Sequence, residues 1–170
     1  MASLMEELLD VLGKEEKQYQ ELITLASEKT DAVVQGNIEH LTDVTTREQD
    51  AASVLLNLSN KRNRVLTDMA TVLGQSPEEM TITKMIGYLN KQPKEQEALT
   101  RQRDRLLEAG AKMQQLNRQN EALLKQALEM VEFDLTLRRS TRQAPETANY
   151  DKNAYNTGDI LGSSGFDAKQ

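Results

Sequence analysis

The single histidine, His40, is the residue of this chain best suited to group-transfer chemistry. On some helical bundles a solvent-exposed His accepts a phosphoryl group. Glu39 and Asp43 flank His40, however, and their negative charge opposes an incoming phosphoryl group, which needs cations or small residues nearby. We therefore interpret His40 as an ordinary surface residue and keep phosphotransfer as a minor alternative.

Adjacent carboxylates are the second candidate for catalysis, because acid–base chemistry needs side chains that converge on one point. Glu15 and Glu16, like Glu78 and Glu79, are sequence neighbours and therefore lie on different faces of a helix. The chain has no Cys, and one His leaves few ligands for a transition metal. The sequence thus predicts no catalytic residue, no cofactor and no metal site, and we expect a binding protein rather than an enzyme.

Charge and hydropathy restrict the class of partner. The formal net charge is -6, and the Lys and Arg residues are interleaved with Glu and Asp, which argues against binding nucleic acid. Nowhere are there enough consecutive apolar residues to cross a bilayer, and no basic segment precedes an apolar stretch at the N-terminus. We therefore expect a cytoplasmic protein with neither a nucleic-acid partner nor membrane insertion.

An apolar heptad over residues 99–137 predicts one long helix of a bundle or coiled coil. Only Gln102, Asn120 and Asp134 interrupt the apolar seam. A polar seam residue can fix the register of packed helices, whereas a loosely packed bundle would admit water to it. The sequence leaves these two alternatives open. The apolar seam positions are Leu99, Leu106, Ala109, Met113, Leu116, Leu123, Ala127, Met130 and Leu137.

Two further long helices are predicted before this one, over about residues 3–35 and 38–73. Gly36 is predicted to end the first, and Asn37 to cap the second, so that the chain turns back on itself within two residues. In the second helix, we place Ala52 on the apolar line, and Glu48 and Arg62 at its edge. The two helices should form an antiparallel hairpin.

A short helix and a change of composition complete the predicted layout. Ser76 and Pro77 should start a helix that ends near Leu89, and the long helix should follow from about residue 94 to residue 142. After Pro145 the chain is rich in Asn, Gly, Ser, Asp and Thr without a period. We expect an all-α, elongated up-and-down antiparallel bundle of three long helices and one short helix, over residues 1–142, with a flexible C-terminal tail over residues 143–170.

The end of the long helix carries more apolar residues than one neighbouring helix can cover. Leu124, Leu128, Val131 and Leu135 form a second line beside the seam. The short helix or the tail folding back would cover this line in a closed molecule. If the line is open, it forms a docking surface for an amphipathic partner helix with anchors three and four residues apart.

Four pieces of sequence, taken in order, carry a resemblance to a known family. They are the opening segment from Leu4 to Leu12, the junction from Gln35 to Leu41, the run from Asn117 to Met130, and the Tyr-Asp and Tyr-Asn-Thr-Gly pieces at Tyr150 and Tyr155. In this set the chain resembles the FlgN family of flagellar export chaperones, over essentially its whole length. Each piece is a degenerate helical pattern, and only their order is specific.

The resemblance implies a chaperone that holds the terminal helical segments of hook-associated proteins of the hook–filament junction. It implies that the chaperone keeps them unassembled and docks on the export gate protein FlhA. By position, the cargo-binding residues would be Leu123, Leu124, Leu128, Val131 and Leu135, and the gate-docking residue would be Tyr150 or Tyr155.

Two other functions fit the same pattern. A structural coiled-coil protein would bury the apolar line by self-association, as a homo-oligomer. A chaperone for another flagellar cargo, flagellin or the filament cap, would use the same kind of surface. An amphipathic surface specifies the spacing of anchors better than the identity of the partner, so the sequence leaves the cargo and the oligomeric state open.

Overall fold

The computed structural model describes the chain from residue 2 to residue 142, with side chains from residue 3. Its elements are α1 (Ala2–Gln35), α2 (Ile38–Val72), a 3-10 turn η1 (Pro77–Glu79), α3 (Ile82–Tyr88) and α4 (Pro93–Arg142). The described range contains no strand, and the predicted all-α bundle is confirmed. The chain divides into two compact units between Ala127 and Leu128. The boundary predicted between residues 142 and 143 falls at the limit of the description and stays a prediction.

The junction of α1 and α2 has the geometry that its sequence predicts. Gly36 adopts a φ of 63°, and the N–H groups of Gly36 and Asn37 donate to the carbonyls of Val33 and Ala32 at 3.1 and 2.9 Å. This pair of bonds is the Schellman arrangement that ends a helix. Asn37 then caps α2, because its side chain accepts from the His40 N–H at 3.0 Å. One residue pair therefore both stops α1 and starts α2.

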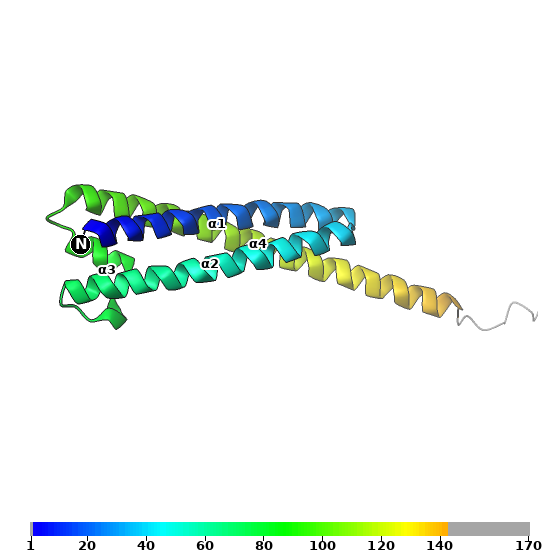
Figure 1. Cartoon of the computed structure of the whole chain (residues 1–170). Coiled ribbons are helices and arrows are strands. Elements are labelled where there is room, and N and C mark those ends of the chain that lie inside the picture. Colours follow the sequence, from blue (N-terminus) through cyan, green and yellow to red (C-terminus); the bar gives the residue numbers. More distant parts are fainter. Residues whose placement is uncertain (1, 143–170) are drawn as a thin grey trace, which may run out of the picture. The chain divides into compact units, whose positions relative to one another are not determined.

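Within the first unit, α1, α2 and the first part of α4 lie side by side, and α3 lies near the end where α1 begins (Figure 1). The core at that end joins Leu8 of α1, Met69 of α2, Met85 of α3 and Leu99 of α4, all fully buried. Farther along, a second cluster joins the middle parts of the long helices, with Met113 of α4 packed against it. The first part of α4 therefore runs parallel to α1 and antiparallel to α2.

The apolar line of α2 differs from the predicted one by one position. Ala51 is buried, whereas Ala52, which we expected on the line, is exposed. Alternating steps of four and three residues from Val44 reach Ala51 and not Ala52. Ala51 follows this regular heptad and packs in the same cluster as Val44. The edge position predicted for Arg62 agrees with its half-buried side chain, which is bonded to Glu15 of α1.

The segment after α2 also differs from its prediction. Ser76 makes no side-chain capping bond, and Pro77 opens only the 3-10 turn η1. The short helix α3 begins later, where the Thr81 side chain accepts from the Lys84 N–H at 3.1 Å. Met80, between the two pieces, is buried in the core. Met80 and Thr81 both have extended backbone, with ψ of 120° and 163°, and this interrupts the helix between η1 and α3.

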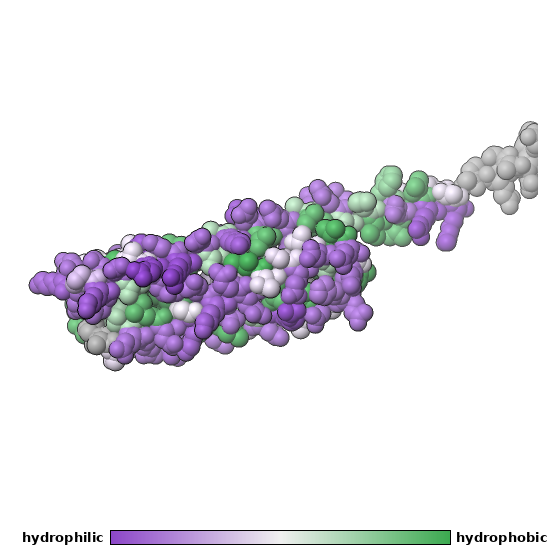
Figure 2. Space-filling view, turned by 90° about the horizontal axis from the view of Figure 1, so that it is seen from above, coloured by the Kyte–Doolittle hydropathy of each residue, from purple (hydrophilic) through white to green (hydrophobic). Residues whose placement is uncertain are grey.

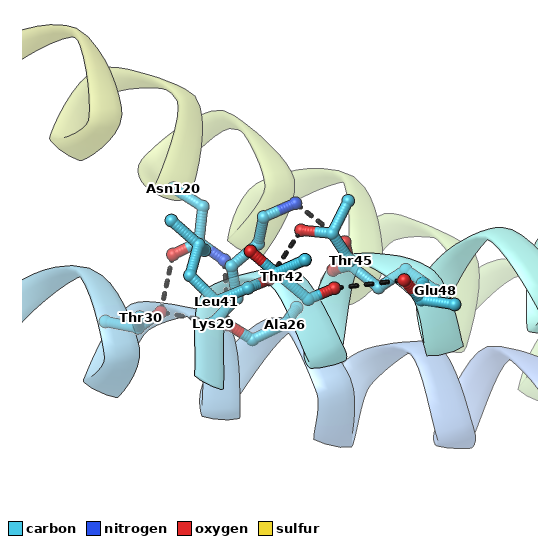
Figure 3. Close-up of polar contacts among 9 residues, drawn as sticks. Ala26, Lys29, Thr30, Leu41, Thr42, Thr45, Glu48 and Asn120 are labelled. Atoms are coloured by element: carbon cyan, nitrogen blue, oxygen red, sulfur yellow. Dashed lines mark hydrogen bonds and ion pairs between the residues drawn. The ribbon is translucent and has the colours of Figure 1, made fainter. Parts of the chain in front are cut away.

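Two of the three polar seam residues of α4 are bonded to α1. Asn120 is 2% exposed, its Nδ2 donates to the Ala26 carbonyl at 2.7 Å, and its Oδ1 accepts from the Thr30 hydroxyl (Figure 3). Gln102 donates Nε2 to Glu16 at 2.7 Å. Asp134 is exposed. For Asn120 the structure favours a fixed register over a water-filled seam, because a shift of α4 along α1 would break both bonds.

Candidate docking surface

The second unit begins with the last part of α4, residues 128–142, whose apolar side chains are exposed. Leu128 is 64% exposed, Val131 54% and Leu135 48%. They follow one another at intervals of three and four residues, so they share one face of the helix. We call these three residues the first stripe. Figure 2 shows hydrophobic side chains gathered on the exposed surface of this segment.

The same segment carries three more exposed apolar residues at the same spacing. Met130 is 70% exposed, Phe133 67% and Leu137 54%. We call these the second stripe. Since an α-helix turns by about 100° per residue, the centres of the two stripes lie about 160° apart around the helix axis. The segment is therefore apolar on two nearly opposite faces.

The second stripe contains a residue that the sequence analysis left out. Phe133 lies three residues after Met130 and four before Leu137, so heptad counting alone would have found it. The predicted seam instead followed Asp134, the next residue, because it continued the register set by Asn120 and Leu123. That register belongs to the bundle, where α4 packs on α1, and the first unit ends at Ala127.

The other predicted site residues have different environments. Leu123 and Leu124 belong to the first unit, where both are half-buried. Tyr150 and Tyr155, predicted for docking to the gate, lie outside the described residues. The exposed part of the predicted cargo surface is therefore the first stripe.

A groove in the first unit is the other candidate surface. It has a volume of about 640 Å³, and its lining includes Tyr19, Leu107 and Gly110. Its two cationic residues already have anionic partners, since Arg62 is bonded to Glu15 and Arg103 to Asp104. Of the apolar residues that line the groove, Leu66 and Met80 are buried and Leu107 is exposed, whereas residues 128–142 carry six exposed apolar residues. We therefore take residues 128–142 as the stronger candidate.

The residues weighed for catalysis are not brought together. Glu15 is buried and bonded to Arg62, whereas Glu16 is bonded to Gln102. His40 lies in the first turn of α2, where its main-chain N–H is bonded to Asn37. Over the described residues, no cluster of three or more His, Asp or Glu side chains is arranged to hold a metal ion. None of the helices described here is both long and apolar enough to span a bilayer.

Comparison with known protein families gives a match over most of the chain. The sequence model of a family described as FlgN protein matches residues 1–158. The match includes all the described elements, both stripes and the two tyrosines at positions 150 and 155. No curated protein and no solved structure matches the chain.

Proposed function

The chain belongs to the FlgN family, whose members are flagellar export chaperones, and we propose that it binds the terminal helical segments of hook-associated proteins through the first stripe. In this proposal the chaperone acts in the cytoplasm, keeps these clients unassembled and brings them to the export gate. It performs no catalysis, because what it supplies is a surface that covers the apolar face of the client.

The exposure of the first stripe is the observation that carries the proposal. Leu128, Val131 and Leu135 are 48% to 64% exposed to solvent, at the spacing of a helix–helix seam. Full burial of a side chain of this size contributes about 1.5 to 3 kcal/mol to binding. A helical client can bury these side chains by packing its own apolar face against the stripe. Such binding needs no nucleotide, since release follows from competition for the client's helix.

A binding titration with a helical peptide from a hook-associated protein tests the proposal. Leu128→Asp and Val131→Asp each place a charge in the seam, and we expect each to weaken binding by about tenfold or more. Leu107→Asp is the matched control, because Leu107 lies on the same helix and is 65% exposed, but lies in the first unit. Equal binding by the wild type and both stripe variants would contradict the proposal, provided that circular dichroism shows unchanged helicity.

The same titration separates the proposal from its two alternatives. If the chain binds flagellin or the filament cap protein more tightly than a hook-associated protein, the proposed surface stands and the proposed cargo is wrong. Sedimentation at several protein concentrations tests a structural coiled coil. A stable oligomer that is lost in Val131→Asp would show that copies of the chain, rather than a client, cover the stripe.

Docking to the export gate protein FlhA is a separate part of the proposal. The two tyrosines Tyr150 and Tyr155 fall within the family match, and we assign the contact to one of them. A pulldown with the cytoplasmic domain of the gate should lose the chaperone in Tyr150→Ala or in Tyr155→Ala, while client binding is unchanged. If the gate domain still captures the double variant Tyr150→Ala/Tyr155→Ala, the contact lies elsewhere in the chain.

A further inference from the structure

The second stripe is left open when a client occupies the first. A helix that pairs with Leu128, Val131 and Leu135 covers one side of residues 128–142. Met130, Phe133 and Leu137 lie about 160° away around the helix axis, on the side that faces away from such a client. An exposed apolar stripe that contains an aromatic residue is typical of an interaction surface.

All the cationic residues of the segment lie on one side of the helix. Arg138, Arg139 and Arg142 all lie within about 60° of the centre of the first stripe. Glu132 also lies on that side. These three arginines and Glu132 are exposed, and together they give the first stripe a net positive surround.

The second stripe has an acidic surround. Glu129 flanks it on one side and Asp134 on the other, each about 70° from its centre, and both are exposed. The remaining polar neighbours are hydroxyl residues, Ser140 and Thr141. No Lys or Arg of residues 128–142 lies on this side of the helix. An apolar seam with carboxylates along both edges is the pattern that pairs with a helix carrying cations at the equivalent edges.

We propose that the second stripe is a separate docking surface for a basic amphipathic helix, one with an apolar seam flanked by Lys or Arg. The spacing of Met130, Phe133 and Leu137 matches one seam of a two-helix coiled coil, and Glu129 and Asp134 select the charge of the partner. Because the two stripes face apart and differ in the sign of their surroundings, the segment holds two different helices at the same time. Pairing of the second stripe with the same stripe of another copy fits less well, because an antiparallel arrangement sets Asp134 against Asp134 of the other copy.

A designed peptide tests the proposal without knowledge of the natural partner. The probe is a fluorescently labelled helical peptide of three heptads, with Leu at both seam positions and Lys at both flanking positions. We expect it to bind the full-length chain, and Phe133→Ser to weaken binding by about tenfold or more. The double variant Glu129→Lys/Asp134→Lys should weaken it to a similar extent at low salt, and less at high salt.

Two controls separate a specific site from attraction to an acidic protein. Val131→Ser alters the first stripe at a residue as exposed as Leu137, and it should leave binding of the Lys-flanked peptide within about twofold. A second peptide with Glu in place of every Lys should show the opposite order, with Val131→Ser weakening it more than Phe133→Ser.

Three outcomes would overturn the proposal. In the first, Val131→Ser and Phe133→Ser would weaken binding of the Lys-flanked peptide equally. In the second, the charge-reversed variant Glu129→Lys/Asp134→Lys would bind this peptide as tightly as the wild type does. In the third, sedimentation would show a dimer that Phe133→Ser abolishes, which would make a second copy the occupant. None of these measurements uses a hook-associated protein, so the proposed function and this inference can fail independently.

Discussion

Arg62 of α2 donates Nη1 to both carboxylate oxygens of Glu15 in α1, at 3.0 and 3.1 Å, and Nη2 to the Ser59 hydroxyl at 2.9 Å. The Glu15 side chain is 1% exposed, whereas that of Arg62 is 24% exposed. Burial disfavours the charged form of Glu15 more than Arg62 favours it, so the pKa of Glu15 lies above its ordinary value of 4.5. The ion pair fixes how α1 faces α2, although removing the carboxylate from water opposes the attraction between the charges.

The raised pKa of Glu15 predicts a pH dependence of stability. The native state holds the Glu15 proton more tightly than the unfolded chain does, so this group's contribution to the free energy of unfolding grows as pH falls. The change should occur between the raised native pKa and 4.5, and above that window the contribution is constant. Urea unfolding of the wild type and Glu15→Gln over this range measures it. The wild type should gain stability relative to Glu15→Gln as pH falls, and a relative loss would mean that Arg62 dominates.

The buried amide of Asn120 predicts opposite effects for two substitutions. Asn120→Ala removes its bonds to Ala26 and Thr30 and should lower the free energy of unfolding by about 1 to 3 kcal/mol. Asn120→Leu should raise the thermal midpoint, because an apolar residue packs better on the seam, but should also permit other registers and oligomers. Sedimentation and thermal unfolding report both effects. A more stable Asn120→Leu that remains a single species would show that Asn120 does not select the register.

The contrast between core and stripe predicts that Leu→Ala substitutions differ sharply in their effect on folding. Leu8 is fully buried among α2, α3 and α4, so Leu8→Ala should lower the free energy of unfolding by about 2 to 5 kcal/mol. Leu135 is 48% exposed, and Ala is also a good helix former, so Leu135→Ala should change it by less than about 0.5 kcal/mol. Chemical denaturation measures both. A large loss in Leu135→Ala would indicate that the stripe is packed in the free chain.

Local signals predicted the hairpin well because they depend on few residues. Gly36 stops α1 through a positive φ, and Asn37 caps α2 through its own side chain, so neither needs information from distant parts of the chain. The seam of α4 was also predictable as far as Ala127, since it is covered by α1 and α2. The break between η1 and α3 was not, because no local signal marks the extended backbone at Met80, whose side chain is buried in a core assembled from four helices.

The candidate surface was predictable in part. The spacing of Leu128, Val131 and Leu135 indicated an apolar line beyond what one neighbour needs, but not whether the chain itself covers it. Their exposure could be learned only from the packing of the described helices. Phe133 was missed because the bundle's register was carried past the point where the bundle ends. Heptad counting should restart where the neighbouring helices stop.

Replacing glycine by alanine should have opposite effects at Gly13, inside α1, and at Gly36, just after its C-terminus. Gly36 has a φ of 63°, and a Cβ built there meets nothing within 4 Å, so the cost of Gly36→Ala comes from the backbone alone and should be about 1 to 2 kcal/mol. Gly13 lies inside α1 and also has nothing within 4 Å, so Gly13→Ala should stabilise by about 0.5 to 1 kcal/mol through helix propensity. Gly36→Asn should fall between Gly36→Ala and the wild type, because Asn tolerates the left-handed conformation better than Ala. Thermal and urea unfolding of the three variants test the assignment, and a destabilising Gly13→Ala would mean that space rather than conformation determines the effect at that position.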